Sequence, residues 1–151
     1  MLQMKALHVE ADALQQKIPP ALLWTSSMPA ERDFFAATCV QVALQQLLLL
    51  IHRPSLPTRN QAGGPPLSPS SFDAAVSAAL RTSYIIQALG KRGKFSLPFV
   101  GAAMTEAAGT LGLALLGANQ AGLVVDEEVL AQGLLRCRDS VAESCETPLA
   151  V

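Results

Sequence analysis

The stretch LLLLIHRPSLP, residues 47–57, decides the fold class because a continuous apolar run ends abruptly at a histidine, an arginine and a proline. The apolar positions continue upstream at steps of three and four, which predicts a helix from about Pro29 to Arg53, buried on most sides. Pro54 ends this helix because proline lacks the amide donor. The pair His52-Arg53 could be a reactive site, a membrane flank or the polar end of a buried helix, where such side chains suit the free carbonyls.

Four other segments have helical periodicity and recognisable ends. The expected ranges are Leu2–Lys17, Phe72–Leu89, Ser96–Leu116 and Asp126–Cys145. We expect Ser70 or Ser71 to cap the helix that begins at residue 72, because a serine hydroxyl can accept hydrogen bonds from the free amides of a first turn. Gly117 is expected to end the following helix, and the Asp126 side chain to cap the last one.

The connection between the second and third helices, residues 54–71, has the sequence PSLPTRNQAGGPPLSPSS. Its proline, glycine and serine content predicts a long loop or linker. No segment alternates polar and apolar residues for long enough to be a convincing strand. The sequence therefore predicts an all-α fold, an irregular bundle of about five helices that forms a single domain or a domain fragment over residues 1–151.

Membrane insertion and secretion are both disfavoured by the pattern of polar residues. Leu44–Ile51 is far too short to span a bilayer. Leu97–Val125 is longer, but its Glu106 would cost about 2.5–3.5 kcal/mol at the membrane centre. We therefore expect a buried helix rich in alanine and glycine there, and no membrane partner. The N-terminus lacks the apolar core of a signal peptide, and three dispersed cysteines suit a reducing compartment such as the cytoplasm.

Residues that could carry catalysis are few and form no recognised motif. The chain has two histidines, and no serine stands in a GxSxG turn, so a serine–histidine–carboxylate triad is not predicted. Cys39 lies in the apolar helix and is interpreted as a small core residue, whereas Cys137 and Cys145 lack the spacing of a metal pair. We expect no catalytic, cofactor-binding or metal-binding residues, and no enzyme activity.

Charged and aromatic residues elsewhere are explained by local structure. The stretch GKRGK, residues 90–94, lacks the GxxxxGK[ST] spacing and a preceding strand, so it is interpreted as a solvated turn. The acidic run 126–128 suits the positive end of a helix dipole. Trp24 is interpreted as a hydrophobic anchor. The formal net charge of −1 gives no general attraction to nucleic acid.

The segment ALQQLLLLIHRPSL, residues 43–56, resembles the most recognisable part of the fungal-specific transcription factor domain, the helical middle region of fungal zinc-cluster regulators. That family typically has a leucine and isoleucine run followed by Leu-His-Arg-Pro, so His52, Arg53 and Pro54 are the signature positions, with a structural role. Four more segments look similar in collinear order: LQQKIPPAL, FDAAVSAALRTSYIIQAL, SLPFVGAAMTEAAGTL and VLAQGLLRCRDSVAESC. The chain departs from the family's common aromatic or cysteine residues at Leu14, Leu44 or Gln45, Ser55, and Val76 or Ser77.

The resemblance implies a non-catalytic regulatory or interaction module in transcription regulation, located in the nucleus. Its partner would be a protein or the missing part of the domain, with a small-molecule effector as an additional partner. The family's DNA-binding module needs six clustered cysteines, which this chain lacks, so direct sequence-specific DNA binding is not expected. The alternative is a standalone helical protein that binds a small apolar ligand or a partner helix.

Overall fold

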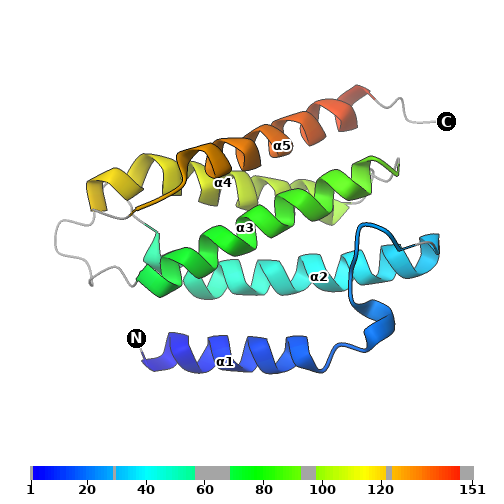
Figure 1. Cartoon of the computed structure of the whole chain (residues 1–151), viewed down its shortest axis with the longest axis horizontal. Coiled ribbons are helices and arrows are strands. Elements are labelled where there is room, and N and C mark those ends of the chain that lie inside the picture. The colour runs from blue at the N-terminus through cyan, green and yellow to red at the C-terminus, as the bar shows by residue number, and fades with distance from the viewer. Residues whose placement is uncertain (1, 29, 57–68, 93–97, 122–123, 147–151) are drawn as a thin grey trace.

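The computed structural model describes residues 2–28, 30–56, 69–92, 98–121 and 124–146, and these residues confirm the all-α prediction. They form five α-helices and two short 3₁₀ helices, with no strand in the described ranges. Figure 1 shows the helices stacked in layers, with α3 between α2 on one side and α4 and α5 on the other. The bounds are α1 Leu2–Gln16, η1 Pro20–Leu22, α2 Glu31–His52, η2 Arg53–Ser55, α3 Pro69–Gly90, α4 Pro98–Ala121 and α5 Glu127–Glu146.

The core is organised around α3, which packs against α2, α4 and α5. At one end of α3, Phe72 joins Leu111 of α4 and Leu130 of α5 in one buried cluster. At the other end, Ile85 and Ile86 pack with residues from α2 and α4 in a second cluster. Helical spacing predicts an apolar stripe on this helix, and the stripe is buried or half-buried throughout because α3 has a neighbour on most sides. It comprises Phe72, Ala75, Val76, Ala79, Leu80, Ser83, Ile86 and Leu89.

Small residues allow the helices of the first cluster to approach closely. Five fully buried alanines line α3 and α4, namely Ala75, Ala79, Ala107, Ala114 and Ala118. Gly133 of α5 is the tightest point, because a Cβ atom built there would lie 2.7 Å from Cδ2 of Leu80 and 2.8 Å from Cδ1 of Leu111. The buried alanines and Gly133 therefore serve close packing.

The buried helix expected at Leu97–Val125 is only partly confirmed, because one side of α4 is open. A Cβ at Gly101, Gly109 or Gly112 of α4 would meet no atom within 4 Å, and Leu116 is 75% exposed.

Trp24 anchors the segment between α1 and α2, in agreement with its interpretation as a hydrophobic anchor. Its ring packs against the second core cluster, and its indole Nε1 donates a hydrogen bond to Thr38 Oγ1 at 3.0 Å. Arg92 crosses to the same segment and donates to the carbonyl of Met28 at 2.7 Å, while its guanidinium lies 3.8 Å from the centre of the Phe34 ring. The turn predicted for residues 90–94 is present at Lys91 and Arg92, but Arg92 is half-buried rather than solvated; residues 93–94 lie outside the described ranges.

Several helix ends differ from the sequence prediction by a few residues. Helix α3 begins at Pro69, so Ser70 and Ser71 lie inside its first turn and do not cap it, because proline is well suited to the first helical position. Helix α4 continues past Gly117, which is buried and does not end it. The predicted cap of α5 is confirmed, since the Val129 amide donates to Asp126 Oδ1 at 3.1 Å. The centre of the predicted loop, residues 57–68, lies outside the described ranges.

Helix α2 is buried on less of its circumference than the sequence predicts. Leu49 and Ile51 of the leucine run are buried, but Leu47 is 37% exposed and Leu50 is 64% exposed. A continuous run of apolar residues covers all sides of a helix, whereas α2 has neighbouring helices on only part of its surface in the described structure. One side of α2 thus remains apolar and open to solvent.

Candidate functional site

The three signature positions lie at the junction of α2 and η2. His52 is the last residue of α2, and Arg53 and Pro54 open the 3₁₀ turn that follows. The predicted helix end is therefore correct to within one residue. The expected contact of these side chains with the free carbonyls of α2 is not observed in the described part of the chain. The His52 side chain contacts His8, and the Arg53 guanidinium lies 3.5 Å from Glu106 on α4. The ion pair between Arg53 and Glu106 is largely exposed and contributes little to stability.

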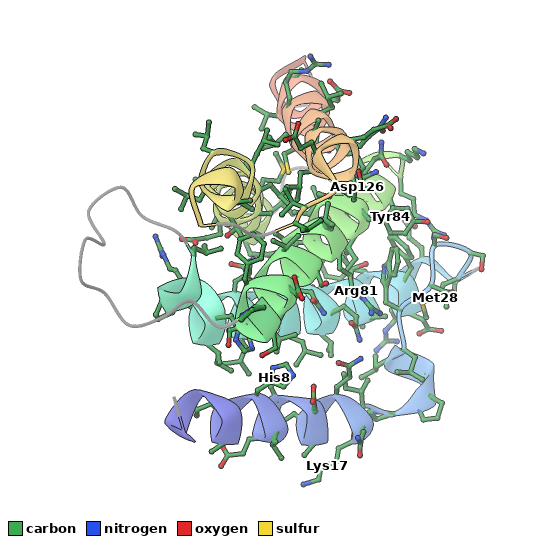
Figure 2. The ribbon with its side chains drawn as sticks, turned by 60° about the vertical axis from the view of Figure 1, so that its left-hand side comes forward. His8, Lys17, Met28, Arg81, Tyr84 and Asp126 are labelled. Carbon is green, nitrogen blue, oxygen red and sulfur yellow. The ribbon has the colours of Figure 1, made fainter. Side chains whose placement is uncertain are left out.

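The two histidines of the chain lie together although 44 residues separate them in the sequence. His8 is on the side of α1 that faces α2, as Figure 2 shows, and its Nδ1 lies 2.7 Å from Nε2 of His52. The other nitrogen of His8, Nε2, lies 3.4 Å from a carboxylate oxygen of Asp12 one turn along α1. The three side chains form a continuous polar connection between α1 and α2.

The arrangement assigns the tautomers of the uncharged pair. Asp12 lies 3.4 Å from Nε2 of His8 and its carboxylate can only accept, so we infer the tautomer in which His8 carries its proton on Nε2 and presents a lone pair at Nδ1. His52 must then donate from Nε2, which leaves a lone pair on its Nδ1. That nitrogen is buried and has no hydrogen-bond partner in the described structure.

His52 is kept uncharged by its surroundings. The residue is 4% exposed, and burial is the main cause that lowers its pKa below 6.5. The nearby His8 lowers the pKa further, while Asp12 partly offsets both effects. Desolvation disfavours the imidazolium form in this way whenever a histidine is buried without a close counter-charge.

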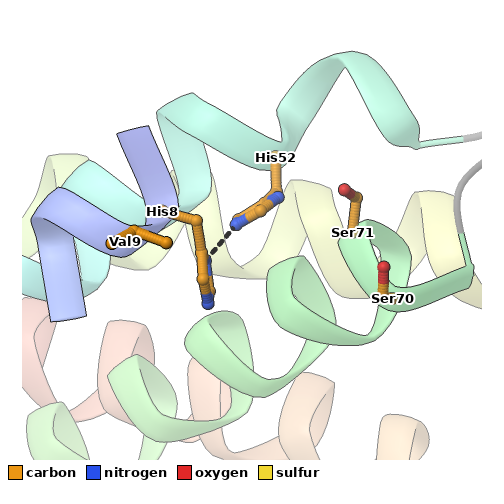
Figure 3. Close-up of a pocket in the computed structure, with 5 residues that line it drawn as sticks. All are labelled: His8, Val9, His52, Ser70 and Ser71. Atoms are coloured by element: carbon orange, nitrogen blue, oxygen red, sulfur yellow. Dashed lines mark hydrogen bonds between the residues drawn. The ribbon is translucent and has the colours of Figure 1, made fainter. Parts of the chain in front are cut away.

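A pocket of about 250 Å³ lies beside this pair. It is lined by His8 and Val9 of α1, His52 of α2, and Ser70 and Ser71 in the first turn of α3 (Figure 3). A nitrogen of His52 points toward the serines in this view, away from His8. The pocket therefore combines an apolar wall, two hydroxyl groups and the unpartnered Nδ1 of His52. We call it the histidine pocket.

Other chemistry-bearing side chains do not join this pocket. Cys137 is buried in the first core cluster, and Cys39 of α2 is half-buried on another side of the helix. Burial raises the pKa of both thiols, which keeps them protonated and weakly nucleophilic. Among the described residues, no group of three or more histidine, cysteine, aspartate and glutamate side chains could hold a metal ion.

The open side of α2 continues onto α4 as a second candidate site. On α2, exposed or half-buried apolar residues follow a heptad spacing, and on α4 a matching stripe ends at Leu116, which is 75% exposed. We call this surface the α2–α4 face; it comprises Ala36, Val40, Ala43, Leu47, Leu50, Ala102, Gly109, Leu113 and Leu116. Between the stripes is a groove of about 210 Å³, lined by both helices and including Cys39, Ala43, Phe99 and Ala102.

The same two helices are long and apolar enough to cross a membrane by length and composition alone. These segments are Glu31–His52 and Phe99–Ala118, and 50% and 39% of their most apolar windows are buried. The core helix of a soluble protein also satisfies this test. Leu44–Ile51, the apolar run of α2 that is too short to span a bilayer, is only part of the helix that forms.

Comparison with known proteins adds no relative, since no family model, curated protein or solved structure matches the chain. The resemblance to the fungal transcription factor domain therefore stays a prediction.

Sequence reasoning singled out His52 but missed its contact with His8. Both residues were visible as the chain's two histidines, yet nothing in their spacing indicates that α1 folds back along α2. The α2–α4 face was also missed, although the half-hydrophobic composition signals more apolar surface than one small core needs.

Proposed function

We propose that this chain is a non-catalytic regulatory or interaction module that acts in transcription regulation by packing against a protein partner or the remainder of its domain. The α2–α4 face carries this proposal, because Leu50 and Leu116 are largely exposed on it. The face is mainly apolar, and the polar side chains beside it include Gln46 in the groove and Glu106, which pairs with Arg53. The collinear resemblance to the fungal transcription factor domain supports the transcriptional role and a nuclear location. The chain itself would not bind DNA sequence-specifically.

An apolar helix suits the α2–α4 face best as a partner element. Small residues such as Ala43, Ala102 and Gly109 leave a shallow floor, and a Cβ built on Gly109 would meet no atom within 4 Å. Leu47 and Leu50 on one side and Leu113 and Leu116 on the other can flank a bound helix. Leucine anchors around a small-residue floor allow the close approach that a helix in a groove requires.

The test places a photo-crosslinking amino acid at Leu50 or Leu116 in cells that express the chain, with Leu135 as the matched control. Leu135 is also exposed but lies on α5, outside the α2–α4 face. We expect one protein to crosslink from both face positions and not from the control. Its purified form should bind the wild-type chain and lose binding to the Leu50→Lys and Leu116→Lys variants, which should keep wild-type thermal unfolding because both positions are exposed.

Three outcomes would contradict the proposal. Crosslinking to lipid alone, together with flotation of the purified chain with vesicles, would assign the face to a membrane. Equal crosslinking from Leu135 would show that contact is not specific. Tight, sequence-selective binding of DNA by the isolated chain, measured against salt concentration, would contradict the non-DNA-binding role.

A second candidate function is the binding of a small apolar ligand in the groove of the α2–α4 face. The groove's volume and its lining by Val42, Phe99 and Ala103 favour this alternative. A screen that measures the thermal stability of the chain with apolar metabolites distinguishes ligand binding from the binding of a partner helix. Strong stabilisation that is lost in Ala102→Phe, where the new ring would occupy the groove, supports the ligand. Stabilisation unaffected by Ala102→Phe excludes the groove.

A further inference from the structure

The lone pair on Nδ1 of His52 is unexplained by the fold. His52 is nearly fully buried, and this nitrogen has no hydrogen-bond partner in the described structure. A buried acceptor without a partner destabilises the folded state, so its presence beside a pocket points to a group that completes it. The α2–α4 face is not involved, and the inference is independent of the function proposed for it.

Addition of one proton to the histidine pair reverses the polarity of the pocket. In the neutral pair, Nε2 of His52 donates to Nδ1 of His8, and Nδ1 of His52 accepts. A protonated pair still shares one hydrogen between these two nitrogens, and it can carry the additional one on Nδ1 of His52. The pocket then holds a donor on a positively charged ring, with Asp12 as a counter-charge beyond His8.

The start of α3 also favours an anion in this pocket. Ser70 and Ser71 stand in the first turn of a 22-residue helix, where the partial positive charge of the helix dipole is concentrated. The backbone amide of Ser71 is one of the four that have no acceptor within the helix. Both serines line the pocket, and the hydroxyl group of Ser71 can donate as well.

We propose that the histidine pocket binds a small oxyanion, a monocarboxylate with an apolar body, together with one proton from solvent. The carboxylate accepts hydrogen bonds from the protonated Nδ1 of His52 and from the first turn of α3. Val9 and the largely apolar lining cover the body of the ligand. No covalent bond forms, and the proton that the pair gains returns to solvent when the ligand leaves. In the empty pocket Nδ1 is covered, so entry of the carboxylate requires a local rearrangement that uncovers this nitrogen.

The charged groups around His52 are consistent with the binding of a carboxylate together with a proton. Asp12 and His8 on α1 are the groups that act on its charge. Arg53, the next residue, is directed to Glu106 on α4, and Asp73 of α3 is exposed to solvent one turn beyond the serines. Because burial lowers the pKa of His52, the uncharged form of this residue is favoured in the empty pocket at pH 7, and proton uptake by His52 must accompany the anion.

The experiment is calorimetric titration of the full chain with benzoate near pH 6, 7 and 8, in buffers of different ionisation enthalpy. We expect millimolar affinity, uptake of about one proton, and about tenfold weaker binding for each pH unit above the pKa of His52. Benzyl alcohol and inorganic phosphate are the comparison probes, the first without the charge and the second without the apolar body. Phosphate binding tighter than benzoate would assign the site to a phosphate group.

Variants and a spectroscopic readout make the outcome decisive. His52→Gln cannot take the proton, so proton uptake and benzoate affinity should both fall, while Cys39→Ser in the groove of the α2–α4 face should change neither. In the wild-type chain with ¹⁵N-labelled histidine, benzoate should move the Nδ1 signal of His52 from the unprotonated to the protonated range. This readout does not depend on a variant that folds. No binding near pH 6, or binding without proton uptake and without that shift, would overturn the proposal.

Discussion

Helices α3 and α1 are held in the molecule by different kinds of contact. Helix α3 packs on three other helices and buries Phe72, Ile85, Ile86 and Leu89 almost completely. Helix α1 packs on α2 and, among its described side chains, buries Ala11, while Leu7, Val9 and Leu14 are exposed. Its defining contact is polar, the 2.7 Å approach of His8 to His52.

This contrast locates stability and responsiveness in different parts of the chain. Apolar burial contributes about 25 cal/mol per Å², so α3, with its large buried side chains, contributes more to the folding free energy than α1 does. A helix attached by little apolar surface opens at low cost, and local opening is concentrated in such elements. We therefore expect core mutations in α3 to change the free energy of unfolding. We expect pH and ligands in the histidine pocket to change how firmly α1 is docked.

The largest expected effect is the replacement of a core aromatic in α3. Phe72→Ala should lower the free energy of unfolding by about 3–5 kcal/mol, because it removes a fully buried ring and leaves a cavity among α3, α4 and α5. Leu14→Ala in α1 should cost about 0.5 kcal/mol or less, because Leu14 is more than half exposed. Chemical denaturation measures both. Equal losses would contradict the division between the two helices.

The second expected effect tests how tightly α5 packs on α3 and α4. Gly133→Ala should destabilise the fold by about 1–3 kcal/mol, since the new methyl group would overlap the side-chain ends of Leu80 and Leu111. Gly109→Ala is the matched control on the open side of α4, where a Cβ meets nothing within 4 Å. That change should stabilise by about 0.5–1 kcal/mol through helix propensity. A stabilising Gly133→Ala would show that the contact is looser than the structure indicates.

The contrast also explains how much of the fold was predictable from the sequence. Periodicity and end signals located the five α-helices of the described residues, because prolines and the Asp126 cap act locally. The stripe of α3 was predicted correctly because a helix that is packed on most sides has a core face that its sequence defines. Ser70 or Ser71 was predicted as the cap because the sequence does not distinguish a serine just before a helix from a serine inside its first turn.

Features that depend on which helices become neighbours were not predictable. The LLLL run, residues 47–50, has leucine on every side, so the sequence could not indicate that Leu50 faces solvent while Leu49 is buried. Arg92 was expected in solvent because its partners, the carbonyl of Met28 and the ring of Phe34, are distant in sequence. The candidate pocket has the same origin, since α1, α2 and α3 each contribute to it.

The smallest expected effect is a pH dependence confined to α1. The pKa of His52 is lowered below 6.5 in the docked state, chiefly by burial, and returns toward 6.5 when α1 opens. The open state therefore binds more protons than the docked state in the window below about pH 6.5, so docking of α1 weakens as the pH falls into that window. Above it both states are neutral at His52 and docking is at full strength.

Hydrogen exchange followed by mass spectrometry at about pH 7.5 and pH 5.5, corrected for intrinsic exchange rates, measures this difference directly. We expect protection of the amides of α1 to fall on acidification while protection in α3 changes little. His52→Gln should remove most of the pH dependence because glutamine does not titrate. Benzoate at the lower pH should restore protection of α1, since a carboxylate in the histidine pocket would stabilise the protonated pair. A uniform loss of protection in both helices would instead place the titration in the common core.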